Sequence, residues 1–297
     1  MSPPRQVLAG ASYLVTRRCA QRQFLLRPCR LTSDVFLYVL ALAAARYGVE
    51  IHAFCVLSNH YHLVVSDPHA RLPAFQQFLD ALVARAINAS LGRWEAFWAP
   101  DTYSAVRLLS PRDVVEKTAY VLANPVDAGL VASGSAWPGL WSAPAWIGGE
   151  ALVAKRPKHF FDPKGGLPDE ITLRLTVPPG FDSAEGFREQ LGLALDAREA
   201  DARSRHHARS GFLGVARVLA QKPTARPAPG EPRRALNPRV AGRDKWKRIE
   251  ALGRLVAFLR AYRKAWKARR AGTEGVCFPV GTYLLRLHHR VACADTG

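Results

Sequence analysis

Two apolar runs separated by only two residues constrain the fold of this 297-residue chain more than any other feature. Residues 49–57 and 60–65 are rich in β-branched and aromatic residues, and Ser58-Asn59 between them is a hairpin signal. Side chains alternate along a strand, so His60 and His62 project from one face, about 7 Å apart. Such a pair usually means two half-buried imidazoles held by hydrogen bonds, but it can also share one divalent cation of unspecified identity.

The sequence around this hairpin predicts the rest of a small sheet. Periodicity indicates a strand, a helix, a second helix and a further strand, in chain order at residues 11–16, 33–47, 71–91 and 103–109. With the helix that follows, the order is β-α-β-β-α-β-α. This order predicts an α+β fold with a ferredoxin-like antiparallel sheet and helices on one face. Such a sheet can hold the two histidines centrally, with the last helix laid across them.

The last helix has a clear start and an expected end. Ser110 is an N-cap residue, Pro111 suits the first helical position and Asp113 stands at the third, in the manner of a capping box. Pro125 disfavours the helical conformation for the residue before it. We therefore expect the helix to end near Asn124.

One tyrosine of this helix lies on its polar face. At 100° per residue, Tyr120 falls on the side of Glu116 and Lys117, away from the apolar stripe, and Asn124 is its neighbour one turn later. A helical tyrosine is more often a core residue, but here the apolar stripe lies elsewhere. Tyr120 is therefore a candidate nucleophile, and Asn124 is a candidate third, oxygen ligand for a metal.

Taken together, these motifs resemble the REP-associated tyrosine transposases, which are single-tyrosine members of the HUH nuclease superfamily. The resemblance covers roughly residues 8 to 150. Its matching segments are SYLVTRRCAQRQFLLRP, HAFCVLSNHYHLVVS, GRWEAFWAPDTYS, YVLANPVDAGLV and WPGLWSAP. The sequence departs from the family at Ser58, where a proline is common, and at Asp127, where an arginine is common. The reversed charge at Asp127 puts a DNA contact at that point in doubt.

The resemblance implies an enzyme with an HUH nuclease core. A divalent metal ion, Mg or Mn, would be held by His60, His62 and Asn124. Tyr120 would attack single-stranded or hairpin DNA, form a 5′-phosphotyrosine link and later rejoin the strand. The expected substrate is repetitive palindromic DNA, and the hairpin sequence itself is not encoded in any recognisable motif.

The positive charge is concentrated in the second half of the chain. Of the net charge of +18, residues 201–272 hold 20 Lys and Arg against 4 acidic residues, an excess of 16. An excess of this density favours a polyanion-binding surface, although a solvated arm is the alternative. The candidate DNA-binding residues are Arg243, Lys245, Lys247, Arg248, Arg263, Lys264 and Lys267.

Composition and length suggest a transposase/nuclease domain at residues 1–150, a connector at 151–200 and a basic, mostly helical DNA-binding region at 201–297. Residues 245–270 are expected as a long basic helix and residues 277–287 as a strand. Trp137, Trp141 and Trp146 are expected as packing anchors rather than base-stacking platforms.

Several classes of protein are disfavoured. No apolar run approaches the roughly 20 residues that span a bilayer, and the first residues lack a secretory signal, so we expect a cytoplasmic protein. Five cysteines form neither a zinc-ribbon spacing nor a disulfide framework. The choice between monomer and dimer stays open.

Two alternatives to the enzyme are kept. The chain could be a hairpin or single-strand DNA-binding protein that retains the fold without cutting. It could also be a rolling-circle replication initiator or relaxase, although those relatives usually carry helicase domains and this chain has no P-loop motif.

Overall fold

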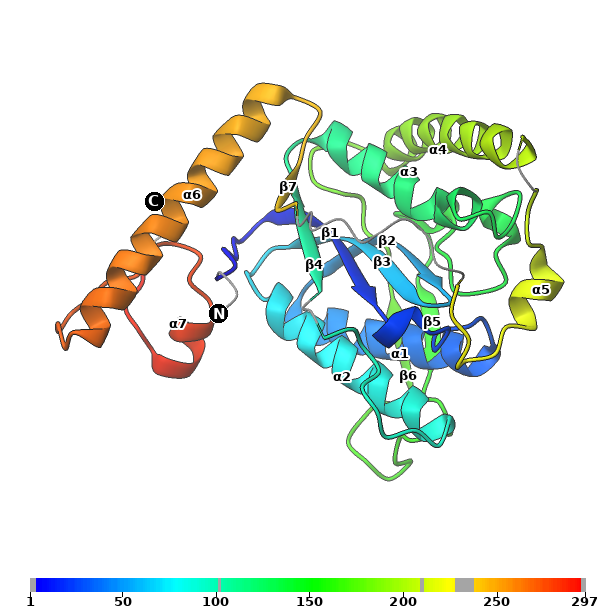
Figure 1. Cartoon of the computed structure of the whole chain (residues 1–297), viewed down its shortest axis with the longest axis horizontal. Coiled ribbons are helices and arrows are strands. Elements are labelled where there is room, and N and C mark those ends of the chain that lie inside the picture. The colour runs from blue at the N-terminus through cyan, green and yellow to red at the C-terminus, as the bar shows by residue number, and fades with distance from the viewer. Residues whose placement is uncertain (1–3, 101–102, 209–210, 228–237, 295–297) are drawn as a thin grey trace.

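The computed structural model describes residues 4–100, 103–208, 211–227 and 238–294. A five-stranded sheet lies at its centre, helices pack on both faces of the sheet, and the long helix α6 (Lys245–Arg270) extends along one side of the molecule (Figure 1). The strands of the sheet, in spatial order, are β2 (Glu50–Leu57), β3 (His60–Asp67), β1 (Ala11–Arg18), β4 (Ser104–Leu108) and β7 (Val240–Ala241).

The first four strands form the predicted ferredoxin-like arrangement. β1 lies between β3 and β4 and is antiparallel to both, while β2 pairs with β3 as a hairpin across Ser58 and Asn59. The fifth strand was not predicted. β7 comes from the basic half of the chain and runs parallel to β4, so the complete sheet is mixed. The α+β fold class is confirmed.

Neighbouring residues of β3 show what covers each face of the sheet. The ring of Tyr61 contacts Phe36 of α1 (Arg30–Tyr47), with centroids 5.0 Å apart, and its hydroxyl donates to Asp80 of α2 (Leu72–Ser90) at 2.6 Å. His62, the next residue, contacts Tyr120 of α3 (Pro111–Asp127) instead. The helices α1 and α2 therefore share one face, and α3 crosses the other over the histidines, as expected.

α3 begins as predicted and ends later than predicted. The Ser110 hydroxyl accepts a hydrogen bond from the amide of Asp113, so Ser110 caps the helix as predicted, and the same hydroxyl donates to the Asp113 carboxylate at 2.6 Å. The predicted end near Asn124 is wrong, because the helix continues through Pro125 to Asp127. A proline in the last turn removes only one helical hydrogen bond. The Ala128 amide donates to the Asn124 carbonyl, and the Trp141 indole donates to the Leu122 carbonyl. These two carbonyl groups near Pro125 therefore have hydrogen-bond donors.

One of the three predicted tryptophan anchors lies in the core and a second packs against it. Trp137 is buried and donates to the Val56 carbonyl of β2 at 3.0 Å. The Trp141 indole donates a hydrogen bond to the Leu122 carbonyl of α3, and the backbone of Trp141 pairs with that of Cys55 in an isolated β-bridge. Trp146 is about one-third exposed. The segment after α3 thus ties the sheet to the helix that crosses it.

The residues expected as a connector contain regular structure. A two-stranded sheet of β5 (Leu152–Lys155) and β6 (Glu170–Leu173) packs on α1, and the Tyr38 hydroxyl donates to the Pro168 carbonyl at 2.6 Å. Next comes α4 (Ala184–His207), which packs along α3. The predicted division at residue 200 falls inside α4, and the main core extends to Val218 of α5 (Val215–Leu219). The division into a domain at residues 1–150, a connector and a basic region stays a prediction.

The end of the chain differs from its predicted form. The expected strand at residues 277–287 is wrong: Phe278 makes one isolated bridge with Cys293, and α7 (Leu284–His289) follows. A small cluster of Ala265, Phe278 and Leu285 holds this segment to α6. The sequence also predicts a Pro- and Arg-rich linker at residues 222–238, part of which lies outside the described residues. Short 3-10 turns occur at Ala20–Arg22, Gly134–Ala136 and Pro144–Trp146.

None of the helices in the described ranges is long and apolar enough to cross a bilayer. The longest of them, α6, carries basic residues throughout and buries only Phe258 and Ala265. Its remaining surface faces solvent, the edge of the sheet or the segment around Phe278.

A buried histidine links the sheet to the segment before α4. His52 is the extra residue of a β-bulge between β2 and β3. Its Nδ1 lies 2.9 Å from the Thr176 carbonyl and its Nε2 lies 2.8 Å from the Ser66 hydroxyl. The ring donates to the first and accepts from the second, which requires the neutral form. Burial lowers the pKa of His52 to about 4, and the bond to Thr176 only partly opposes this shift.

The His52 pKa predicts a loss of stability in mild acid. An unfolded histidine takes up its proton near pH 6.5 and the folded one near pH 4, so the contribution is complete above pH 6.5 and is lost as the pH falls towards 4. At pH 5 the loss amounts to about 2 kcal/mol. His52→Gln keeps a donor and an acceptor but cannot titrate. Denaturant unfolding at pH 7 and pH 5 should show a smaller acid loss in this variant, and equal losses would contradict the assignment.

Candidate active site

The two histidines of β3 meet as the sequence predicts. Both project from the face that α3 covers, and their ring centroids are 4.8 Å apart with the rings nearly perpendicular. His62 is buried and His60 is half-buried. The Tyr120 ring lies 5.4 Å from that of His62. A strand and a helix that are about 60 residues apart in sequence thus bring three of the predicted site residues into contact.

Each histidine has a hydrogen-bond partner at Nδ1. The Asn59 side-chain oxygen lies 2.6 Å from His60 Nδ1, and the Thr16 hydroxyl lies 2.8 Å from His62 Nδ1. A neutral ring that donates its Nδ1–H to such an oxygen leaves a lone pair on Nε2, which is the form that binds metals. In His62 this Nε2 atom is buried and has no hydrogen-bond partner among the described residues. A buried nitrogen without a partner is costly, and a bound cation would satisfy it.

Asn124 is the third predicted ligand. It is buried in the last turn of α3, close enough to His60 for its side chain to oppose the lowering of that ring's pKa. Two imidazole rings and one amide side chain are therefore neighbours, and nitrogen and oxygen donors of this kind suit a divalent cation that accepts both. No group of three or more His, Cys, Asp or Glu residues with metal-binding geometry occurs in the described ranges, so this mixed set is the metal candidate.

The surroundings keep both rings neutral at physiological pH. Burial lowers the pKa of His60 to about 4, and the nearby Arg18 adds to this shift, while the hydrogen bond with Asn124 opposes it. Burial also holds the pKa of His62 well below its usual range, with His60 and Arg18 acting in the same direction. A metal can bind only the unprotonated ring. Near pH 7 both imidazole rings are therefore unprotonated, so a cation can bind them without displacing a proton from either ring.

Cations flank the candidate nucleophile. The Arg198 guanidinium of α4 lies 4.9 Å from the centroid of the Tyr120 ring, and the Lys117 ammonium of α3 lies 5.7 Å from it. Arg18, which is exposed, lies opposite His60 in the register of β1 and β3. Positive charges thus approach the site from three elements. They create a local field that favours an anionic substrate at this place.

The unusual residue Asp127 has a structural partner in α4. Its carboxylate accepts from Arg198 at 2.8 Å and from Arg205 at 2.9 Å, and it is largely buried. Asp127 therefore takes part in an ion-pair cluster that joins α3 to α4. The same cluster fixes Arg198 beside Tyr120.

Sequence reasoning missed several of these residues. Thr16 and Arg198 lie about 45 and 80 residues from their site partners, and no local motif marks them. Asn59 directly precedes His60 in the sequence, and a side-chain oxygen next to a histidine motif is a local signal that could have identified it as a partner of that ring. The sequence shows the acidic residue at position 127, but no local pattern locates its arginine partners in α4.

The predicted DNA-binding residues lie apart from the histidines. Arg243 forms an ion pair with Glu116 of α3 at 2.7 Å. The other six are exposed on α6, at Lys245, Lys247, Arg248, Arg263, Lys264 and Lys267. Their role in DNA binding stays a prediction.

Comparisons with known proteins give two partial structural likenesses. No family model matches the chain, and no characterised protein matches its sequence. A REP-associated tyrosine transposase bound to a REP hairpin is similar with a TM-score of 0.40 and 18% identity, over 47% of this chain and 81% of that chain. A "putative transposase" from Deinococcus radiodurans R1 is similar with a TM-score of 0.28 and 20% identity, over 36% of this chain and 85% of that one.

The contact between Thr16 and His62 can be tested by metal binding. Thr16→Val keeps the side-chain shape and removes the hydroxyl that holds the His62 ring. Loss of such a supporting contact typically lowers metal affinity by about 10- to 100-fold. Ser12→Ala is the matched control, because Ser12 lies on the same face of β1 and bonds Ser66 instead. Manganese titration calorimetry should separate the two variants, and wild-type affinity in Thr16→Val would exclude a supporting role for Thr16.

Proposed function

We propose that this protein is a metal-dependent single-strand DNA transposase/endonuclease. It cuts and rejoins hairpin-containing, repetitive palindromic DNA through a 5′-phosphotyrosine intermediate. The observation that carries the proposal is the meeting of Tyr120 with the two histidines, at 5.4 Å between the Tyr120 and His62 rings. His60, His62 and Asn124 would hold the metal ion, Mg or Mn, and Tyr120 is the nucleophile.

Each group in the site has a distinct task in this proposal. A divalent cation would act as a Lewis acid on the non-bridging oxygens of the scissile phosphate. The Tyr120 oxygen forms a bond to phosphorus while the bond from phosphorus to the 3′ oxygen breaks. The phenol proton passes to solvent, and the departing 3′ oxygen takes up a proton to become a hydroxyl. Arg198 and Lys117 neutralise the phosphate charge beside the nucleophile.

The covalent link explains why rejoining would need no ATP. The phosphotyrosine bond retains the energy of the broken phosphodiester, so a second 3′ hydroxyl can attack it and restore a DNA strand. This chemistry suits strand transfer better than degradation. The 5′ polarity and the hairpin substrate come from the motif resemblance.

Single-stranded DNA also fits the electrostatics. The exposed cations of α6 can contact the backbone of a strand whose cutting site lies at Tyr120, and each contact releases counterions. A non-catalytic DNA-binding protein would share this surface. A protein that only binds DNA does not need a buried ring nitrogen without a hydrogen-bond partner, such as His62 Nε2, beside a tyrosine. This atom therefore favours the enzyme.

Covalent capture tests the nucleophile. With a labelled single-stranded hairpin and manganese, wild-type protein should form an adduct that survives denaturing electrophoresis, and Tyr120→Phe should form none while binding DNA and metal normally. Tyr103→Phe is the control. Burial raises the pKa of Tyr103 to about 12, and its ring contacts Arg5 rather than the histidines, so this variant should form the adduct. An adduct that persists in Tyr120→Phe would move the nucleophile elsewhere.

The salt dependence of binding tests the α6 surface. A variant with four exposed α6 cations changed to Gln, at Lys245, Lys247, Arg263 and Lys264, should lower the slope of log K against log salt by roughly 0.7 for each lost contact, about 3 in all. The control variant changes four exposed cations elsewhere, at Arg30, Arg112, Lys158 and Arg217. Fluorescence anisotropy over a salt series gives both slopes. Equal slopes in the two variants would remove α6 from the DNA interface.

A further inference from the structure

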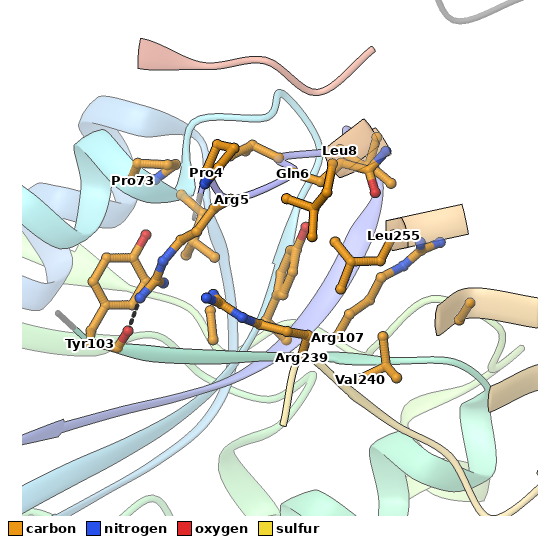
Figure 2. A pocket seen from close by; sticks show the side chains of 16 residues that line it. Pro4, Arg5, Gln6, Leu8, Pro73, Tyr103, Arg107, Arg239, Val240 and Leu255 are labelled. Atoms are coloured by element: carbon orange, nitrogen blue, oxygen red, sulfur yellow. Dashed lines mark hydrogen bonds between the residues drawn. The ribbon is translucent and has the colours of Figure 1, made fainter. Parts of the chain in front are cut away.

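The long helix α6 turns one side to the sheet and leaves the opposite side in solvent. Leu255 lines a cavity of about 120 Å³ together with Val240 of β7 (Figure 2). Phe258, one turn further along the same side, is buried. Because an α-helix turns by 100° per residue, residues nine positions apart lie on opposite sides. Trp246, nine residues before Leu255, therefore lies on the solvent side of α6.

Trp246 is far more exposed than tryptophans usually are. It is 75% exposed, whereas indole rings are in general among the more buried side chains. Its backbone is held in place, because the Asp244 carboxylate accepts hydrogen bonds from the amides of Trp246 at 2.8 Å and Lys247 at 3.1 Å. The first turn of α6 thus presents a flat aromatic ring to solvent at a defined position.

The start of α6 is joined to the helix that carries Tyr120. The Arg243 amide donates to the Asp113 carboxylate at 2.9 Å, and the Arg243 guanidinium pairs with Glu116 at 2.7 Å. Glu116 lies one turn before Tyr120 on the same side of α3. Trp246 follows three residues after Arg243. A strand with a phosphate at Tyr120 can therefore continue onto the start of α6.

Cations accompany the ring along its side of α6. The Lys245 ammonium lies 5.8 Å from the centroid of the Trp246 ring. Arg260, Lys264 and Lys267 are exposed within about 60° of the direction of Trp246, at 100° per residue. The solvent side of α6 therefore combines an aromatic ring near the site with a row of positive charges beyond it.

The charge of α6 determines what can bind this side. The helix contains one acidic residue, Glu250, which pairs with Arg254 at 2.5 Å. The positive charge of a second copy of α6 would repel it, whereas a nucleic acid strand supplies phosphates for the cations and flat bases for the ring. Duplex DNA keeps its bases stacked on one another, so it has no free base face to offer. The surface therefore fits a single strand.

We propose that Trp246 stacks on an unpaired base of the single strand that Tyr120 cuts, a role that rests on the proposed function. The cations of α6 hold phosphates whatever the strand, and the indole adds a contact that only an unpaired base can make. Trp246 thereby gives the basic surface of α6 a preference for single-stranded over double-stranded DNA.

Binding without cutting tests the stacking contact. In the full-length Tyr120→Phe protein without divalent metal, fluorescence anisotropy gives the affinity for a labelled single strand of thymidines and for an abasic strand with the same number of phosphates. Adding Trp246→Ala should weaken binding of the thymidine strand by about fivefold or more, the usual loss for one stacked base. Affinity for the abasic strand should not change, and the slope of log K against log salt should keep its value, since no phosphate contact is lost.

Two further variants separate stacking from a loss of structure. Trp246→Phe keeps an aromatic ring and should retain most of the affinity for the thymidine strand. Trp94→Ala removes a tryptophan that is 96% exposed in the segment after α2, and it should bind both strands as the Tyr120→Phe parent does. Truncation of an exposed side chain changes stability little, so all variants should keep the melting temperature of the parent.

Several results would overturn the proposal. They are undetectable binding of the thymidine strand by the parent, equal binding by Trp246→Ala and the parent, or an equal loss of affinity for the abasic strand. Self-association of the parent that Trp246→Ala abolishes, measured by sedimentation, would instead make the ring an interface between copies. Because these measurements need neither metal nor cutting, a Trp246 effect in a protein that forms no phosphotyrosine adduct would contradict the nuclease and leave the stacking contact in place.

Discussion

The register between β1 and β3 is the constraint on which the candidate site depends. Thr16 stands opposite His62 and Arg18 opposite His60 in the antiparallel pairing. A shift of one residue would send both histidines to the face covered by α1 and α2 and would separate His62 from the hydroxyl that holds its ring. Burial of Tyr61 against Phe36 on that opposite face opposes such a shift, because the same slip would expose its ring to the polar site.

The packing of α4 on α3 adds the second layer of the site. Asp127 accepts from two arginines of α4, and this cluster sets the position of Arg198 over Tyr120. A largely buried carboxylate with two guanidinium partners is costly to break, because any single removal leaves an uncompensated charge. A helix that follows the motif segments in the chain thereby contributes to the surroundings of the candidate nucleophile. The site therefore depends on the contacts of α3 with the sheet and with α4, and not on α3 alone.

The basic half of the chain is connected to the sheet rather than separate from it. β7 adds a parallel strand beside β4, Arg243 pairs with Glu116, and the Arg243 amide donates to the Asp113 carboxylate. These contacts join the start of α6 to the first turn of α3. The charge of the basic region is thus distributed in space, partly on the exposed length of α6 and partly at Arg239, which lies beside Arg107 of β4.

The sequence alone determined the local features of this protein. Alternating and helical periodicities predicted the seven elements of the first half, since burial of one face imposes those periods, and Ser110 fixed the start of α3. Spacing of two along a strand put His60 and His62 on one face, and spacing of four along a helix put Tyr120 beside Asn124. Only the tertiary structure decided the contacts of high sequence separation: Thr16 with His62, Arg198 with Tyr120, and β7 with β4. Such contacts depend on how whole elements pack, and no local pattern around Thr16, Arg198 or Val240 encodes a partner so far along the chain.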